Sequence, residues 1–340
     1  MTTVSTFGAP GGTSSATDPG ALFLKLFGSE VLASFEETSV MRDKHMIKQI
    51  SNGKSATFPA VGRASASYHA QGADILSGST YLTAMAHNER VIIVDEMLQS
   101  SVFITEIAEL RNHWETRQEY ARQIGFALGT KFDKQVLKTV GLAARAAEVV
   151  AGDFGDLSAA TDKQVTAGNM ETQGSDLMEA LFDSAELLDR MHVPDASDGR
   201  RWAVVKPGMY YNLLSVAPAN TTVASPADSR VGGGASVMQS APAPITVAGI
   251  KVVSSTHIDN AGAGSTETGT YTNYDEVDSA AISGFVFHES AVGTAQLRDL
   301  VVTQDWIPEN LGTLLVGRMA VGHNYLRANA SIELNTTAWT

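Results

Sequence analysis

The middle of the chain carries a long stripe of apolar residues at helical spacing. From Glu106 to Ala146, apolar side chains recur at intervals of three, four or a small multiple, the repeat of one helix face. The stripe consists of Ile107, Leu110, Trp114, Ala121, Ile124, Leu128, Phe132, Val136 and Val140. Asp95 follows an apolar run in an N-cap position, so the pattern predicts one helix-forming stretch from Asp95 to about Ala147. Residues 106–146 alone would span about 60 Å at about 1.5 Å per residue. Such a helix suits a protein that works as a strut rather than an enzyme of this size.

The composition excludes several classes of protein. The 340 residues carry a formal net charge of −13, which argues against nucleic-acid binding over the whole surface. The absence of cysteine removes disulfides, thiolate nucleophiles and cysteine-based metal sites. No apolar run approaches the roughly 18 residues of a membrane-spanning helix. Residues 1–20 lack the features of a signal peptide and are expected to be a flexible tail.

A short helix lined with phenylalanine is predicted after this tail. Asp18-Pro19 is typical of a helix start, and an apolar residue recurs every four positions at Phe23, Phe27, Val31 and Phe35. This face could pack on its own domain, dock on a neighbouring subunit or lie on a membrane surface. The membrane alternative is disfavoured because the polar face is acidic.

An extended β-hairpin is predicted between His45 and Val94. Small residues alternate with polar ones here, and glycines and a proline interrupt the pattern. The alternating positions are Thr57, Ala64, Ala66, Tyr68 and Ala70. A hairpin with so few large apolar side chains buries little surface by itself. We therefore expect a partner surface to stabilise it.

The second half of the chain mixes helices and strands without a regular βαβ rhythm, which favours the α+β class. An amphipathic helix is predicted at 177–191 and a short one at 207–216. Strands are predicted at 201–206, 284–287, 297–303 and 314–324, with a hairpin at 245–254 turned at Ala248-Gly249. The loops 217–244 and 256–279 separate these elements.

No constellation of residues indicates catalysis or a cofactor. Gly53-Lys54-Ser55 lacks the first glycine of a phosphate-binding loop and is interpreted as a tight turn. The eight histidines have no metal-ligand spacing. His288-Glu289-Ser290 is a run of adjacent residues rather than a triad and is interpreted as a strand-to-turn transition. The acids at 275, 276 and 278 lack the calcium-hand pattern.

One short segment opposes the acidic character of the chain. Five basic residues lie from Arg42 to Arg63 against a single acid, Asp43, giving +4. The five are Arg42, Lys44, Lys48, Lys54 and Arg63. This base of the hairpin could face an acidic neighbour or packaged DNA, or it could be an ordinary mixed surface.

Several separated blocks closely resemble the major capsid protein of T7-like short-tailed phages, in matching order and spacing. The blocks are ALFLKLFGSEVLASFEETSV (21–40), SNGKSATFPAVGR (51–63), HNERVIIVDEML (87–98), ESAVGTAQLRDL (289–300) and MAVGHNYLRANA (319–330). The resemblance covers most of the chain and is weakest at 147–174 and in the two long loops. It implies the HK97-type capsid fold.

The resemblance also implies a division of the chain. Residues 1–47 would be an N-terminal arm, 48–94 an extended loop, and 95–173 a peripheral domain with a spine helix. Residues 174–283 would be an axial domain, and 284–340 would return to the sheet of the peripheral domain. Cross-linked relatives use a lysine on the extended loop, whereas no lysine lies between Ser55 and Arg117 here. Isopeptide cross-linking is therefore not expected.

The implied function is self-assembly, as hexamers and pentamers, into an icosahedral shell around double-stranded DNA. The implied partners are other copies of the chain, a scaffolding protein, a portal protein and DNA bound on the inner face without sequence specificity. The chain would reside in the virion capsid, and in the host cytoplasm during assembly. A tail or decoration component is the alternative. The candidate interface residues are Phe23, Phe27, Phe35, Arg42, Lys44, Lys48, Lys54, Arg63 and Tyr68.

Overall fold

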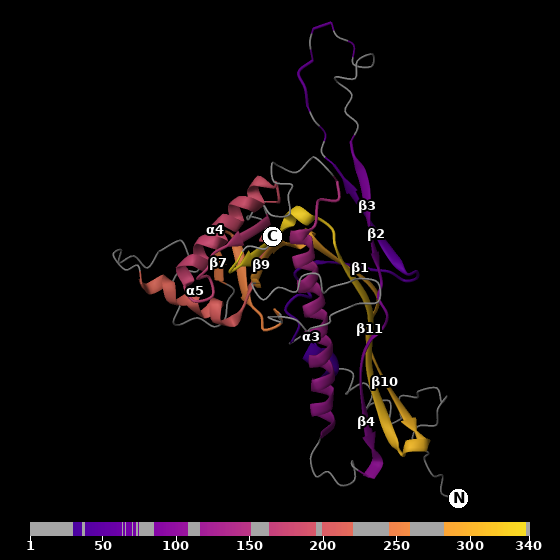
Figure 1. Cartoon of the computed structure of the whole chain (residues 1–340). Coiled ribbons are helices and arrows are strands. Elements are labelled where there is room, and N and C mark those ends of the chain that lie inside the picture. Colours follow the sequence, from indigo (N-terminus) through magenta and orange to yellow (C-terminus); the bar gives the residue numbers. More distant parts are fainter. Residues whose placement is uncertain are drawn as a thin grey trace, which may run out of the picture.

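The computed structural model describes most of the chain as a mixed α+β structure with three sheets. In Figure 1 a long helix runs beside a tall sheet, two helices lie on the opposite side, and a hairpin projects from one end. None of the helices in the described part is long and apolar enough to cross a membrane. The described residues are 30–35, 38–62, 64, 66–69, 71–72, 74, 85–107, 116–150, 163–194, 199–219, 245–258 and 282–337.

The long helix begins later than the sequence pattern predicts. Helix α3 (Thr116–Arg145) has 30 residues and a length of about 45 Å at about 1.5 Å per residue. The predicted apolar face is confirmed where it is described: six members of the stripe, from Ala121 to Val140, are at most 3% exposed. Ile107 lies before the helix and is 57% exposed. Leu110 and Trp114 lie outside the described residues.

The predicted helix start at Asp95 is wrong. Residues Leu98–Thr105 form strand β4 instead, and the backbone N–H of Asp95 donates to the carbonyl of Val321 at 3.2 Å. The segment is rich in Ser, Thr, Val, Phe and Ile, which favour extended backbone. Val102 and Ile104 alternate with exposed residues, so the local period is two rather than 3.6.

The tall sheet has the order β1-β10-β11-β4, and its two long strands confirm the predicted pair near the C-terminus. Strands β10 and β11 are antiparallel and joined by a turn at Pro308–Asn310. Alternate residues of β11 face α3, so a Cβ at Gly317 would lie 2.9 Å from Ile124. The other strands of this sheet are β1 (Met46–Gln49), β10 (Val292–Ile307) and β11 (Gly312–Tyr325).

A second sheet of six strands, in the order β5-β12-β9-β6-β8-β7, forms the other half of the body. Helix α4 (Gly174–Arg190) packs against α5 (Pro207–Ala219) beside it. The predicted helices, strands and the Ala248-Gly249 turn are confirmed in this half, whereas β5 and β12 were not predicted. The strands are β5 (Gln164–Thr166), β6 (Arg201–Val205), β7 (Ile245–Val247), β8 (Ile250–Ser254), β9 (Ile282–His288) and β12 (Ser331–Asn335).

Polar contacts at the C-terminal end of helix α3 hold it against the six-stranded sheet. The guanidinium of Arg145 donates to both carboxylate oxygens of Glu333 on β12, at 2.9 and 2.7 Å. Glu333 is fully buried, and this paired, two-pronged contact compensates its charge. The buried ammonium of Lys163 donates to the carbonyl of Ala143, which suits the negative end of the helix dipole.

The predicted hairpin is confirmed at its root. Strands β2 (Ser55–Val61) and β3 (His87–Ile93) pair antiparallel over seven residues each and form a sheet of their own. Figure 1 shows them leaving the body beside the top of the tall sheet. Gly53, with φ of +105°, occupies the turn before β2, in agreement with the tight-turn interpretation.

Candidate functional site: assembly surfaces and the docked arm

The two faces of the hairpin root differ in burial. On the inner face, Ile92 is buried and Arg90 donates to the side chain of Asn324 at 3.2 Å while stacking over the ring of Tyr325. On the outer face, Val61 is 50% exposed, Val91 38% and Ile93 36%. We call the outer side chains of Pro59, Val61, Val91 and Ile93 the hairpin stripe. Each of these apolar side chains stands opposite a polar residue of the other strand, so the outer face is mixed, and it exposes apolar side chains on a thin, two-stranded element.

Glycines on β10 and β11 lie at the point where the hairpin leaves the body. A Cβ at Gly322 on β11 would lie 2.1 Å from the carbonyl oxygen of Ile93 and 2.8 Å from the Cα of Val94. A Cβ at Gly293 would lie 2.7 Å from Leu326 and 3.1 Å from Ile92. Only glycine permits the close approach of backbone to backbone at Gly322, whereas Gly293 makes room for the side chains of Leu326 and Ile92.

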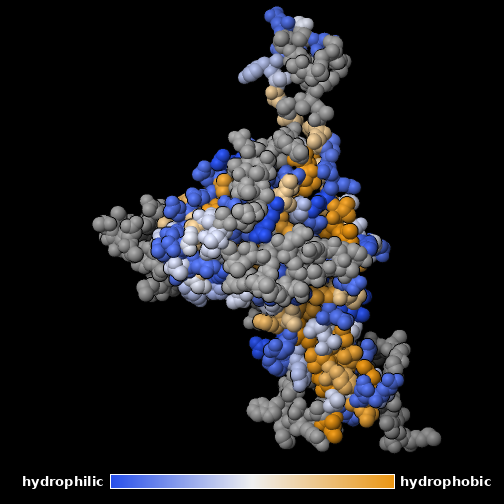
Figure 2. Space-filling model, viewed as in Figure 1, coloured by the Kyte–Doolittle hydropathy of each residue, from blue (hydrophilic) through white to orange (hydrophobic). Residues whose placement is uncertain are grey.

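Two further apolar surfaces lie on the tall sheet. Strand β1 is an edge strand, and its Met46 and Ile47 are 43% and 39% exposed. At the far end, Trp306, Leu311 and Ile107 are 49%, 63% and 57% exposed, and we call this group the sheet tip. Figure 2 shows hydrophobic atoms gathered over the lower end of the molecule, where β10, β11 and β4 lie in Figure 1. Open edges and exposed aromatic side chains both favour association with another chain.

The segment 30–49, which we call the docked arm, lies against its own subunit. Its helix at 30–35 crosses α3 at two glycines: a Cβ at Gly125 would lie 2.5 Å from the carbonyl oxygen of Val31. A Cβ at Gly129 would lie 3.2 Å from Thr38. Small residues four positions apart let two helix backbones approach closely, as these do here. Val31 and Phe35 are 0% and 1% exposed, so this helix is part of the core.

A buried carboxylate on α3 fixes the turn that follows this helix. Asp133 accepts hydrogen bonds from the hydroxyl of Ser39 at 2.8 Å, the N–H of Val40 at 2.6 Å and the N–H of Met41 at 3.2 Å. Nδ1 of His257, from the segment after β8, lies 3.0 Å from the same carboxylate. Asp133 is fully buried, so its charge depends on these donors. The residue ties together the arm, the long helix and the six-stranded sheet.

A chain of buried histidines fixes the next residues of the docked arm. Nε2 of His45 lies 2.7 Å from the hydroxyl of Thr294, which lies 2.8 Å from Nδ1 of His323. Nδ1 of His45 lies 2.7 Å from the carbonyl oxygen of Met41, so it donates there and Nε2 accepts from Thr294. Burial lowers the pKa of His45 to about 4. Burial and the nearby His45 lower the pKa of His323 to about 3. Both imidazoles are therefore neutral at pH 7.

The basic segment beside the arm is used largely within the subunit. The Arg42 guanidinium lies 5.3 Å from the ring of Phe35, and the Lys44 ammonium lies 4.9 Å from that of Trp202. Lys48 lies 5.0 Å from the ring of Phe58 and donates to the carbonyl of Thr57 at 3.0 Å. Three of the five cations thus rest on aromatic faces of their own chain, an arrangement that sequence spacing cannot reveal.

The expected interface residues differ in burial and in whether the structure describes them. Phe35 packs edge-on against Phe132 with ring centroids 5.9 Å apart, which corrects its expected role as an anchor to a neighbour. The alternative, packing on its own domain, holds for this residue because α3 offers a glycine-lined surface nearby. Tyr68 is fully exposed, and Lys54 is exposed in the turn before β2. Phe23, Phe27 and Arg63 lie outside the described residues.

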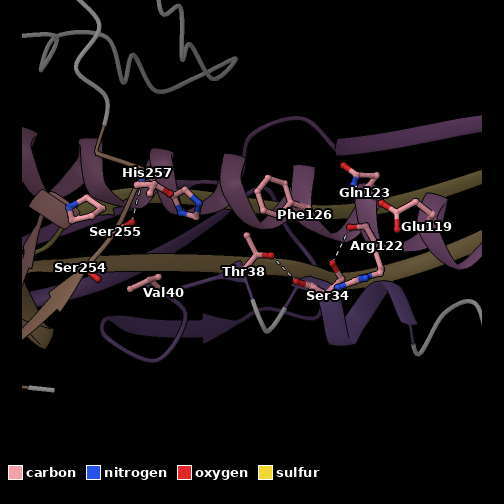
Figure 3. A pocket seen from close by; sticks show the side chains of 12 residues that line it. Ser34, Thr38, Val40, Glu119, Arg122, Gln123, Phe126, Ser254, Ser255 and His257 are labelled. Carbon is pink, nitrogen blue, oxygen red and sulfur yellow. Dashed lines mark hydrogen bonds between the residues drawn. The ribbon is translucent and has the colours of Figure 1, made fainter. Parts of the chain in front are cut away.

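A groove of about 560 Å³ lies between the arm helix, α3 and the segment after β8. Figure 3 shows Phe126 on α3 between Thr38 of the arm and Gln123, with His257 at the far end. Phe126 is 54% exposed. The imidazole of His257 is held by Asp133, so the groove combines an aromatic wall with a structural histidine. It has the character of a junction between elements rather than of a reaction site.

The remaining sequence motifs have structural roles. Nδ1 of His288 lies 2.8 Å from the hydroxyl of Ser290 and accepts from its N–H at 3.1 Å, which confirms the strand-to-turn interpretation. The acids at 275, 276 and 278 lie outside the described residues. Within the described ranges, no group of three or more His, Asp or Glu side chains could hold a metal ion.

Comparison with known proteins decides the family. The model of the family described as "Gp10A-like: Major capsid protein" matches residues 57–335. The chain belongs to this family. The major capsid protein of Escherichia phage T7 is 31% identical over 337 residues, covering 94% of this chain and 93% of that protein. The family membership favours a shell protein over a tail or decoration component.

Solved capsid structures share the fold. The capsid structure of the cyanophage P-SCSP1u matches with a TM-score of 0.67 and 32% identity, covering 88% of this chain and 89% of that one. The mature capsid of bacteriophage PhiM1 matches with a TM-score of 0.66 at 17% identity, covering 89% and 88%. The chain is thus a Gp10A-like major capsid protein with an HK97-type fold. It forms a phage capsid shell through self-association and is a component of the virion.

Proposed function

We propose that the chain assembles as hexamers and pentamers into an icosahedral shell that encloses double-stranded DNA. The observation that carries this proposal is the hairpin stripe, a set of exposed apolar side chains on an element that projects from its own body. A copy held by several neighbours gains avidity, so each contact can remain weak enough to correct errors. A scaffolding protein and a portal protein complete the proposed set of partners.

The proposed division follows the resemblance. The arm is 1–47, the extended loop 48–94, the peripheral domain 95–173 with 284–340, and the axial domain 174–283. The hairpin stripe, the edge strand β1 and the sheet tip are the proposed contact surfaces between copies. The full exposure of Tyr68 supports the same role for the outer part of the extended loop.

The test is a charge placed on the hairpin stripe. Val91→Asp, co-expressed with the scaffolding protein, is expected to give folded subunits but no closed particles, because an unpaired carboxylate buried in a contact costs several kcal/mol. Electron microscopy counts the particles, and circular dichroism checks the fold. Val91→Ile at the same position retains the apolar surface and is the matched control. Particles of normal size and yield from Val91→Asp would show that this surface is not a contact.

A further inference from the structure

Two lysine ammonium groups from distant segments lie over one indole ring. Nζ of Lys44, from the docked arm, is 4.9 Å from the ring centroid of Trp202, and Nζ of Lys251 is 4.8 Å from it. Trp202 on β6 and Lys251 on β8 are direct partners in the sheet register. Hence the sheet positions Lys251 beside the indole, and the docking of the arm positions Lys44 there. All three side chains are half-buried.

These two cations differ from the other paired cations of the body. Arg145, Arg201 and Lys206 each meet a carboxylate. Within the described ranges, neither Lys44 nor Lys251 forms an ion pair. Both ammonium groups lie over the indole ring, and that of Lys44 also donates to the carbonyl of Val40. Burial lowers the pKa of Lys44, although the charges of Asp43 and Asp133 oppose this effect. Asp133 is already committed to the arm and His257. A chain with a net charge of −13 therefore keeps a local positive site.

A third cation borders this site. Arg200 lies two residues before Trp202, and its side chain is 59% exposed. Its guanidinium is 3.7 Å from the carboxylate of Glu289, a long contact between exposed groups that is weak in water. Gly199 next to it leaves room for Lys251, because a Cβ there would lie 3.3 Å from Nζ. The site thus consists of an indole with two ammonium groups over it, and a third basic residue lies two positions before that indole in the chain.

We propose that Lys44, Lys251, Arg200 and Trp202 bind the phosphodiester backbone of DNA without reading its sequence. This inference rests on the proposed enclosure of DNA by the shell. Ammonium groups bind phosphates as point charges without a directional fork, which suits contact with a phosphodiester backbone without sequence readout. An acidic protein segment is the competing occupant, and binding of polyglutamate tests for it.

The test measures binding of a labelled 30-base-pair duplex to the full-length chain by fluorescence anisotropy between 25 and 150 mM KCl. Each phosphate contact by a cation contributes about 0.9 to the slope of log affinity against log salt. The double variant Lys44→Gln/Lys251→Gln is expected to lower this slope by about 1.8 and to weaken binding about tenfold at low salt. Arg122→Gln, which removes an exposed cation on α3 that is distant in sequence from Trp202, is the matched control and should change neither value.

Further measurements distinguish a folding defect or another binding partner from a failure of the proposal. Lys251→Gln alone leaves the arm residue in place and should lower the slope by about 0.9, so a folding defect of the double variant does not block the test. An unchanged slope in both variants overturns the proposal. Binding of polyglutamate, lost in the variants while duplex binding persists, would assign the site to an acidic protein and also overturn it. Electron microscopy of particles from the same variants reports separately on the proposed shell function.

Discussion

The docked arm and the hairpin are neighbours in sequence, yet the subunit buries the apolar side chains of the arm and leaves those of the hairpin exposed. The hairpin was expected to rely on other copies, and docking on a neighbouring subunit was one of the alternatives for the arm helix. In the arm, Phe35 is 1% exposed and the backbone of Val40 and Met41 donates to a buried carboxylate of the same subunit. In the hairpin, Val61 is 50% exposed and Tyr68 fully exposed. One segment is completed within the chain, and the other leaves apolar surface for a neighbour.

The contrast has a physical cause in the surface that each segment meets. Helix α3 offers the arm two glycines and a buried acid, so backbone can approach backbone and its polar groups find partners. The hairpin meets the body at its root, where Gly322 lies against the end of β3, and at Asn88, whose side chain donates to the carbonyl of Val149 at 2.6 Å. The outer side chains of Val61, Val91 and Ile93 on β2 and β3 remain exposed, because a two-stranded sheet has no second layer of its own on that face. We therefore expect adhesion to neighbours to be concentrated in the segment that its own subunit leaves exposed.

The largest effect on this contrast is expected from Asp133→Ala. The change leaves the N–H groups of Val40 and Met41 and the hydroxyl of Ser39 without their acceptor, at a cost of roughly 3 kcal/mol or more. The arm should then detach and become as sensitive to proteases as the hairpin. Urea unfolding and limited proteolysis measure the two consequences. Ser39→Ala removes one of these donors and should cost only about 1 kcal/mol. A protease-resistant arm in Asp133→Ala would contradict the assigned role.

Acid should loosen the arm before it affects the hairpin. The pKa of His45, about 4, lies below its usual 6.5, so the unfolded or undocked segment binds protons first. The contribution of the buried neutral imidazole is complete above pH 6.5 and falls as the pH drops toward 4. Between pH 7 and pH 5 the loss is about 2 kcal/mol for this histidine. Proteolysis of the arm across this range measures it, and His45→Gln should remove the share of this histidine while leaving that of His323. Equal acid sensitivity of the variant would rule out this origin.

The sequence revealed elements whose signal is local. The apolar stripe of α3 predicted its buried face from Ala121 to Val140, because the helix period repeats over many residues. Ala248 and Gly249 predicted a hairpin turn, and both have positive φ in the structure, 49° and 78°. The start at Asp95 failed because the helical period was extended across β4, where a short alternation governs. The residues that make β4 a strand pair with β11, more than 200 positions away.

The candidate site was harder to predict because its decisive contacts are not local. The spacing of Phe35 indicated an apolar face but not which surface covers it. The five basic residues were recognised as a cluster, yet their aromatic partners lie as far away as Trp202. The missed residues include Asp133 and the pair Gly125 and Gly129. The four-residue spacing of those glycines was the one available signal of a close helix crossing.

The smallest effect is expected from Gly125→Ala, where the sign of the change in the free energy of unfolding is informative. Alanine ordinarily stabilises a helix by up to about 1 kcal/mol over glycine. At Gly125 the added Cβ would lie 2.5 Å from the carbonyl oxygen of Val31 and 2.8 Å from Cβ of Ser34, so the arm helix must shift. Overpacking costs about 1–3 kcal/mol, and we expect a net loss of about 1 kcal/mol. Gly208→Ala in α5 meets nothing within 4 Å and should instead be neutral or stabilising. Thermal unfolding of the two variants gives the comparison. Stabilisation by both would mean that the arm adjusts its position on α3 without cost, and the contrast between a docked arm and a projecting hairpin would then rest on Asp133 and His45 alone.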